Sequence, residues 1–118
     1  MSEKEPCVYI LASKRNGSLY VGVTSDLFGR MREHVQGLKS DFASRHQIKR
    51  LVHHEYFVTM QEAIAREKHL KRRHRAWKIR LIEQHNPEWR DLYCTKSGEI
   101  SDLANDRVSN QFSPATLW

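Results

Sequence analysis

The sequence predicts a small α+β domain in which a three-stranded antiparallel sheet is flanked by helices, in the order β-β-α-β-α-α. Three observations predict this fold. Two short runs rich in β-branched and aromatic residues flank an Asn-Gly pair, which is typical of a β-hairpin. A third such run, residues 49–58, follows a segment with helical periodicity. Two further helical segments come after it.

The chain of 118 residues is long enough for one domain with a modest core. It contains no apolar run near the roughly 20 residues needed to cross a bilayer, and its acidic, polar start is unlike a signal peptide. We therefore expect a cytoplasmic protein with no membrane association. Cys7 and Cys94 lie far apart and fit neither a metal motif nor a disulfide framework, so both are expected to be free thiols.

The first two strands flank Asn16-Gly17, two residues that tolerate the positive φ of a two-residue turn. Such a turn predicts three strand pairs: Ser13 with Tyr20, Leu11 with Gly22, and Tyr9 with Thr24. Because side chains alternate along a strand, Tyr9, Tyr20 and the bare backbone of Gly22 should share one face, with the two phenols roughly 13 Å apart.

The first helix is predicted to begin after Ser25 as its N-cap, with Asp26 in the first turn, and to end at Gly37. Its buried stripe consists of Leu27, Met31, Val35 and Leu38. Arg30 and His34 lie one turn apart at the edge of this stripe, so phenols, a guanidinium and an imidazole converge on one surface. The alternative is an ordinary half-buried hairpin with its tyrosines in the core and both helix residues solvated.

A polar loop is predicted over residues 39–47, followed by the third strand over residues 49–58. The adjacent His53 and His54 in this strand point to opposite faces, so they cannot bind one ion together and are interpreted as filler. Thr59 and Glu62 form a capping box, which opens a helix that runs to about His74.

This second helix carries a carboxylate on its apolar side. The predicted inward stripe consists of Met60, Ala63, Ile64, Glu67, Leu70 and Lys71. Burying Glu67 costs free energy unless a positive group meets it. The candidates are a buried arginine such as Arg30, in a structural ion pair, or a divalent cation.

A third helix is predicted over residues 75–84. Its apolar side consists of Trp77, Leu81 and Ile82. It should end at Asn86-Pro87, because proline disfavours helical geometry in the residue before it. The residues expected to fold back onto the core are Trp89, Leu92 and Tyr93. We expect the folded domain over residues 1–94 and a mobile C-terminal tail over residues 95–118.

The positive charge is concentrated in one segment. The chain carries 20 Lys and Arg against 14 Asp and Glu, a net charge of +6, and between residues 66 and 80 the only acid is Glu67. A basic surface of this kind favours a polyanionic partner, although charged helix faces also serve solubility alone. The residues expected to contact nucleic acid are Lys68, Lys71, Arg72, Arg73, Arg75 and Lys78.

Five separated positions together resemble, in the right order, the pattern of the GIY-YIG endonuclease domain. They are Tyr9-Ile10, Tyr20-Val21-Gly22, Arg30 with His34, Glu67 and Asn86. The resemblance covers residues 7–93 and is greatest to small stand-alone members, which are related to the N-terminal nuclease domain of an excinuclease.

The resemblance implies an endonuclease that hydrolyses phosphodiester bonds of DNA through one divalent cation, Mg²⁺ or Mn²⁺, in DNA repair. Glu67 would hold this ion, weakly in the absence of DNA, because one carboxylate supplies few ligands. Tyr20 would help to activate the attacking water or act as the base, and Arg30 would stabilise charge on the scissile phosphate. The positions that would orient water and phosphate or support the site are Tyr9, His34 and Asn86.

Two other functions remain open on the sequence. A nucleic-acid-binding module of the same fold would grip phosphates through the basic segment with little or no cleavage. A protein-docking domain would instead keep Glu67 in an ion pair with Arg30. For the nuclease, the expected substrates include branched or damaged DNA, and a partner protein is a further means of targeting.

Overall fold

A computed structural model describes residues 5–36, 46–94 and 99–100 of the chain. The elements follow in the order β1 (Cys7–Ala12), β2 (Leu19–Thr24), α1 (Leu27–Gln36), β3 (Arg50–Tyr56), α3 (Met60–Arg72) and α4 (Arg75–His85). This is the predicted α+β order. None of the described helices is long and apolar enough to cross a membrane.

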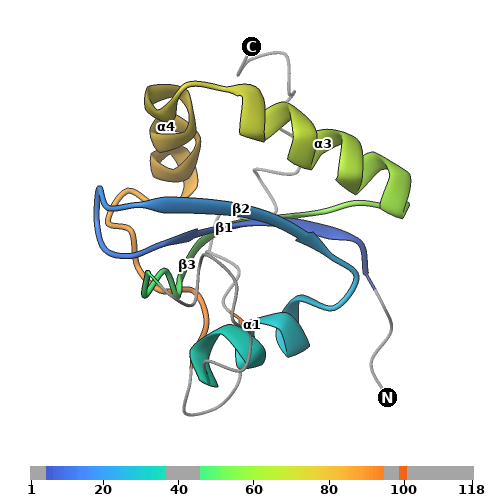
Figure 1. The fold of residues 1–118 in the computed structure, drawn as a ribbon, viewed down its shortest axis with the longest axis horizontal. Helices are drawn as coiled ribbons and strands as arrows, with labels where there is room; N and C mark the ends of the chain where they lie inside the picture. Colours follow the sequence, from blue (N-terminus) through green and yellow to red (C-terminus); the bar gives the residue numbers. More distant parts are fainter. Residues whose placement is uncertain (1–4, 37–45, 95–98, 101–118) are drawn as a thin grey trace.

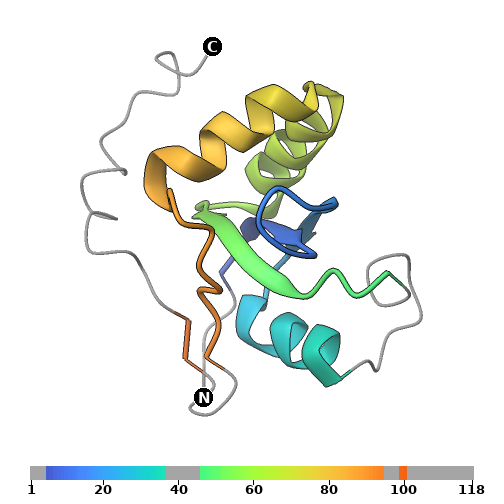
Figure 2. The ribbon, with the colours of Figure 1, turned by 90° about the vertical axis from the view of Figure 1, so that its left-hand side faces the viewer.

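The sheet is antiparallel and has the strand order β2-β1-β3, so the first strand is central. Helix α1 covers one face, and α3 and α4 cover the other (Figures 1 and 2). All six residues of β1 are fully buried, because alternate side chains enter the two cores on either side of the sheet.

The two cores have different membership. On the α1 face the cluster consists of Cys7, Tyr9, Leu11, Leu27, Met31, Ile48, Leu51, Leu92 and Tyr93. On the face of α3 and α4 it consists of Val8, Ile10, Ala12, Val21, Val52, Ala63, Leu70, Leu81, Ile82 and Trp89. The candidate site residues on α1 and on α3 therefore start from opposite faces of the sheet.

The predicted two-residue hairpin turn is wrong. The structure pairs Tyr9 with Gly22 and Leu11 with Tyr20, and residues 13–18 form the connection. The physical reason lies in this connection: the Ser18 amide donates to the Ser13 hydroxyl at 2.9 Å, and the Gly17 amide donates to the Lys14 carbonyl at 2.8 Å. The turn is therefore centred one residue earlier than predicted, which moves the register by two.

The turn also shows why Asn16 stands where it does. Its φ is 60°, in the left-handed region that asparagine tolerates better than most residues. The Arg75 guanidinium donates to the Asn16 carbonyl at 2.7 Å, which ties the hairpin end to α4.

Helix α1 is capped by Asp26 rather than by Ser25. The Asp26 carboxylate accepts from the Gly29 amide at 3.1 Å, and the Thr24 hydroxyl accepts from the Asp26 amide at 3.0 Å. Leu27 and Met31 are buried as predicted. Leu38, the predicted helix end at Gly37 and most of the predicted loop lie outside the described residues.

The capping box at the start of α3 is confirmed. The Thr59 hydroxyl accepts from the Glu62 amide at 3.1 Å, and the Glu62 carboxylate accepts from the Thr59 amide at 3.4 Å. The predicted inward stripe is only partly correct, since Ala63 and Leu70 are buried whereas Met60, Ile64 and Lys71 are exposed. The helix is rolled so that Arg66 faces β3, where it pairs with Glu55 at 2.8 Å.

The C-terminal part of the domain folds back as predicted. Leu81 and Ile82 of α4 are buried, the helix ends at Asn86, and Trp89, Leu92 and Tyr93 enter the cores. This segment also closes the outer edge of β3: the Leu51 amide donates to Asp91, and the Leu92 amide donates to the Leu51 carbonyl.

Of the predicted tail, the structure describes Glu99 and Ile100. Ile100 forms an antiparallel bridge with Tyr93 and packs against the α1-side core. Cys7 and Cys94 are thiols rather than disulfide partners, as expected.

Candidate active site

Three aromatic side chains meet on the α1 face of the sheet. The ring centroids of Tyr9 and Tyr20 are 6.3 Å apart, and His34 lies 6.1 Å from Tyr9 and 5.9 Å from Tyr20. The hydroxyl of Tyr9 is 3.4 Å from Nε2 of His34. We call these three residues the aromatic triangle.

The predicted separation of roughly 13 Å between the phenols is therefore wrong. In the observed register Tyr20 lies opposite Leu11, which makes it a diagonal neighbour of Tyr9 across the β1–β2 pair. Diagonal positions are within reach of aromatic side chains. The shift of two residues in the turn thus converts two separate phenols into one cluster.

Gly22 is the floor of this cluster, and the predicted common face of Gly22 and the tyrosines is confirmed. A Cβ atom at Gly22 would lie 2.5 Å from the hydroxyl of Tyr9. The phenol of Tyr9 consequently crosses the bare backbone of β2, and a side chain at position 22 would displace it.

The members of the aromatic triangle differ in exposure. Tyr9 is 0% exposed and His34 is 1% exposed, whereas Tyr20 is half-buried. The alternative of a plain hairpin is right about Tyr9, which packs in the core, and wrong about His34, which is not solvated. Tyr20 is the member of the triangle that can meet an external molecule.

Arg30 lies one turn before His34 on α1, with 31% of its side chain exposed. Its Nε is 3.4 Å from the carboxylate of Glu33. The guanidinium is held by a weak local pair one turn of α1 before His34, so most of its donors remain available to a phosphate.

Glu67 lies on α3, and this helix covers the face of the sheet opposite to α1 (Figure 1), whereas the tyrosines of the aromatic triangle belong to the α1 side. Arg66 reaches Glu55 of β3 from one flank of the helix. Successive residues in a helix are about 100° apart, and the buried Ala63 and Leu70 mark the centre of the packed face. Glu67 therefore lies on the other flank, on the β2 side.

Strand β2 is an edge strand, and α3 contacts both β2 and β1. Tyr20 packs on the α1 face of this strand, and Glu67 lies on the helix that packs on the opposite face. The candidate site is accordingly an arrangement around the β2 edge.

The carboxylate of Glu67 has a lysine as its partner. Nζ of Lys71 lies 2.6 Å from Oε2 of Glu67, one turn along α3. Glu67 is only 14% exposed, so it is not turned to bulk water. The ion pair between Glu67 and Arg30 that the sequence left open is not formed between these two described residues; Lys71 takes that place.

The donor set around Glu67 determines what metal it could hold. Among residues 5–36, 46–94 and 99–100, no group of three or more His, Cys, Asp or Glu is placed to bind an ion. A single carboxylate with a cation already on one oxygen fits a divalent ion that takes its other ligands from water and substrate.

Asn86 is buried and fully engaged with the backbone. Its amide nitrogen donates to the carbonyls of Val52 and Arg90, and its amide oxygen accepts from the Arg90 amide. These bonds hold the end of α4 against β3. In this structure Asn86 therefore stabilises the turn that follows α4.

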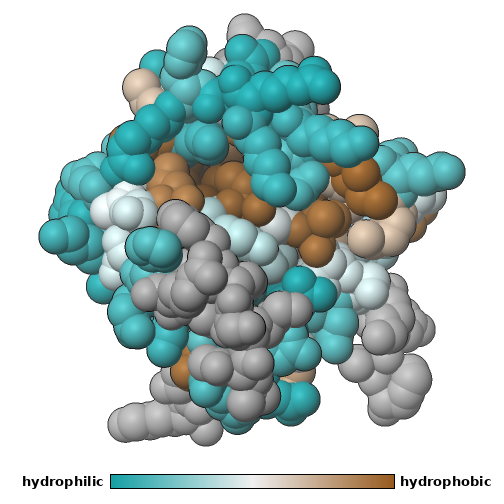
Figure 3. Space-filling model, in the orientation of Figure 1, coloured by the Kyte–Doolittle hydropathy of each residue, from teal (hydrophilic) through white to brown (hydrophobic). Residues whose placement is uncertain are grey.

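The six predicted nucleic-acid contacts divide by exposure. Lys68, Lys71, Arg72 and Arg75 are exposed, whereas Arg73 and Lys78 are half-buried. Burial and the nearby Arg75 lower the pKa of Lys78. Hydrophilic residues cover the outer side of α3 and α4, and hydrophobic ones reach the surface beneath them (Figure 3).

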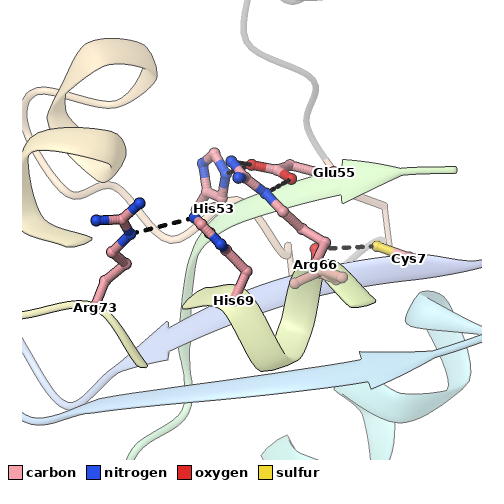
Figure 4. A network of polar contacts seen from close by, with 7 residues as sticks. Cys7, His53, Glu55, Arg66, His69 and Arg73 are labelled. Atoms are coloured by element: carbon pink, nitrogen blue, oxygen red, sulfur yellow. Dashed lines mark hydrogen bonds and ion pairs between the residues drawn. The ribbon is translucent and has the colours of Figure 1, made fainter. Parts of the chain in front are cut away.

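A polar network between β3 and α3 was missed by the sequence analysis (Figure 4). Arg66 donates two hydrogen bonds to Glu55, at 2.8 and 3.0 Å, and His53 lies 2.8 Å from the same carboxylate. Burial alone would raise the pKa of Glu55, but His53 and Arg66 outweigh it and lower this pKa to about 2. His53 is therefore a structural partner and not filler.

The network continues toward α4. Arg73 donates to His69 at 3.2 Å, and the guanidiniums of Arg66 and Arg73 both lie over the ring of Trp77. Burial and the surrounding arginines lower the pKa of His69. The His53–Glu55 pair had a sequence signal, since residues two apart in a strand share a face. The pairing of Arg66 with Glu55 had no such sequence signal.

Comparison with known proteins identifies the family of this chain. The profile of the GIY-YIG catalytic domain matches residues 5–80. A UPF0213 protein of Lacticaseibacillus paracasei is 31% identical over 90 residues, which cover 76% of this chain and 100% of the relative. A UPF0213 protein of Staphylococcus aureus is 34% identical over 77 residues, which cover 65% of this chain and 93% of the relative.

Among solved structures, the solution structure of a UPF0213 protein from Bacillus halodurans is similar with a TM-score of 0.48 and 28% sequence identity. The similarity covers 74% of this chain and 92% of that one. The profile match spans the hairpin, α1, β3, α3 and the start of α4, and so includes the aromatic triangle, Arg30 and Glu67. This chain therefore belongs to the family of GIY-YIG catalytic domains, which is a nuclease family.

Proposed function

We propose that the protein is an endonuclease that hydrolyses phosphodiester bonds of DNA at the β2 edge, with one divalent cation, Mg²⁺ or Mn²⁺, at Glu67. The observation that carries this proposal is the aromatic triangle, with Arg30 one helical turn before its His34, in a chain of this family. Branched and damaged DNA are the first substrates to test, and DNA repair is the corresponding process.

The different exposures of the three aromatic side chains suggest different roles for them. Tyr20 is the accessible phenol, and we assign to its hydroxyl the transfer of a proton from the attacking water. Tyr9 and His34 are buried, so they would act by fixing the ring of Tyr20. Gly22 lets Tyr9 take this position.

Arg30 and Glu67 supply the charges. The Arg30 guanidinium can bind two oxygens of the scissile phosphate, and the carboxylate of Glu67 would hold the cation. When bound, a divalent cation polarises a phosphoryl oxygen and neutralises the charge that develops on it. The exposed Lys68, Arg72 and Arg75 would hold the neighbouring DNA backbone.

The test is a nuclease panel at low salt with duplex, single-stranded and branched DNA. Wild type, Glu67→Ala and the control Glu88→Ala are compared with Mg²⁺, with Mn²⁺ and with a chelator. We expect cleavage that needs metal, is lost in Glu67→Ala and persists in Glu88→Ala, whose side chain is exposed. The DNA affinity of Glu67→Ala should stay within a few-fold of wild type.

A second candidate is a nucleic-acid-binding module with little or no cleavage. The observation that favours it is the Lys71–Glu67 pair, which satisfies the carboxylate without a metal. It predicts salt-dependent DNA binding through the exposed cations of α3 and α4. If wild type binds DNA but cleaves none of the panel with either metal, this second function replaces the first.

A further inference from the structure

Lys71 and Glu67 form an asymmetric pair on the flank of α3 that faces the β2 side. The carboxylate is 14% exposed and the lysine side chain is 55% exposed. The cation can therefore leave toward solvent more easily than the anion. A lysine also has a flexible stem and carries its charge at one point, so it can swing away without disturbing the helix.

Other nearby cations are engaged elsewhere. Arg66 is held by two hydrogen bonds to Glu55, and Arg73 donates to His69 and lies over Trp77. In the part of the chain that the structure describes, Lys71 is the cation paired with Glu67.

An ammonium and a divalent cation compete for the same carboxylate oxygen. While Lys71 sits 2.6 Å from Oε2 of Glu67, a metal ion must displace it or use the remaining oxygen alone. The lysine therefore lowers the affinity of Glu67 for a metal. Once displaced, its ammonium remains within a side chain's length of the site and can pair with a phosphate.

We propose that Lys71 is the resident counter-ion of Glu67, which gives up this carboxylate to the divalent cation and moves to a phosphate of the bound DNA. This inference rests on the proposed function and adds to it a coupling between metal binding and DNA binding. DNA offers Lys71 a new partner and so raises the affinity of Glu67 for metal. By reciprocity, metal raises the affinity for DNA by the same factor.

The test measures Mn²⁺ binding by electron paramagnetic resonance, without DNA and without turnover. Four proteins are compared: wild type, Lys71→Met, the matched control Lys68→Met, and Glu67→Gln. Lys68 is also exposed and carries the same charge on α3. We expect Lys71→Met to bind Mn²⁺ about 3- to 10-fold more tightly than Lys68→Met, the range that corresponds to loss of one partly screened ion pair. Glu67→Gln should lose this site.

A wild-type measurement avoids any effect of substitution on folding. Wild-type protein is titrated with Mg²⁺, which is diamagnetic, and followed by NMR. The side-chain ¹³Cε resonance of Lys71 should shift, whereas that of Lys68 should not. Equal Mn²⁺ affinity in Lys71→Met and Lys68→Met, with an unmoved Lys71 resonance, overturns the exchange and leaves the metal site at Glu67 intact. Unchanged Mn²⁺ binding in Glu67→Gln overturns the metal assignment of the proposed function itself, and the exchange with it.

Discussion

The Glu55 carboxylate should make the stability of the domain depend on pH between about 5 and 2. Its pKa is lowered in the folded protein from an ordinary 4.5 to about 2, because the favourable contacts of His53 and Arg66 exceed the cost of burial. A depressed carboxylate stabilises the fold above its unfolded pKa, and this stabilisation is lost as the pH falls through the folded pKa. The difference of about 2.5 in pKa corresponds to about 3 kcal/mol.

Urea unfolding of wild type and Glu55→Gln, measured from pH 7 to pH 2, checks this prediction. At pH 7 the variant should be less stable by up to about 3 kcal/mol, because the largely buried Arg66 guanidinium, 12% exposed, loses its counter-charge. The difference should shrink as the pH falls below about 5, and the two proteins should converge as the pH reaches about 2. The control Glu88→Gln changes an exposed carboxylate and should follow wild type. Parallel curves for wild type and Glu55→Gln over the whole range would refute the reasoning.

Three further predictions concern the hairpin, the thiols and the basic surface. Gly22→Ala should destabilise the fold by about 1–3 kcal/mol in urea unfolding, because its Cβ would strike the phenol of Tyr9; the same cost in a Tyr9→Leu background would contradict this. Iodoacetamide followed by mass spectrometry should label the exposed Cys94 and spare Cys7, whose burial raises its pKa to about 12; equal labelling rates would contradict it. Lys68→Ala should weaken DNA binding and reduce the salt slope by about 1, and an unchanged slope would remove Lys68 from the interface.

Local signals predicted most of the fold. The capping box at Thr59 and Glu62, the apolar side of α4 and the return of Trp89 are fixed by neighbours in the sequence, and each is observed. The hairpin register is different, because it depends on hydrogen bonds within residues 13–18, among them the bond from the Ser18 amide to the Ser13 hydroxyl. Turn propensity alone does not reveal these bonds.

The sequence could predict which residues form the candidate site better than it could predict which of them contact one another. Tyr9, Tyr20 and His34 could be placed on one surface from strand alternation and helical spacing, but their contact required the true register. The partner of Glu67 depended on the roll of α3. This roll is set by Arg66 reaching a carboxylate on β3, eleven residues earlier in the chain.

The central claim is that Tyr20 is the reacting group of the aromatic triangle. Tyr20→Phe removes one oxygen atom and keeps the ring beside Tyr9 and His34. Its single-turnover cleavage rate with Mn²⁺ should fall by about 10²- to 10⁴-fold, the range typical for loss of a proton-transfer group. Its melting temperature and DNA affinity should remain those of wild type. A Tyr20→Phe protein that cleaves DNA at the wild-type rate would contradict the claim directly.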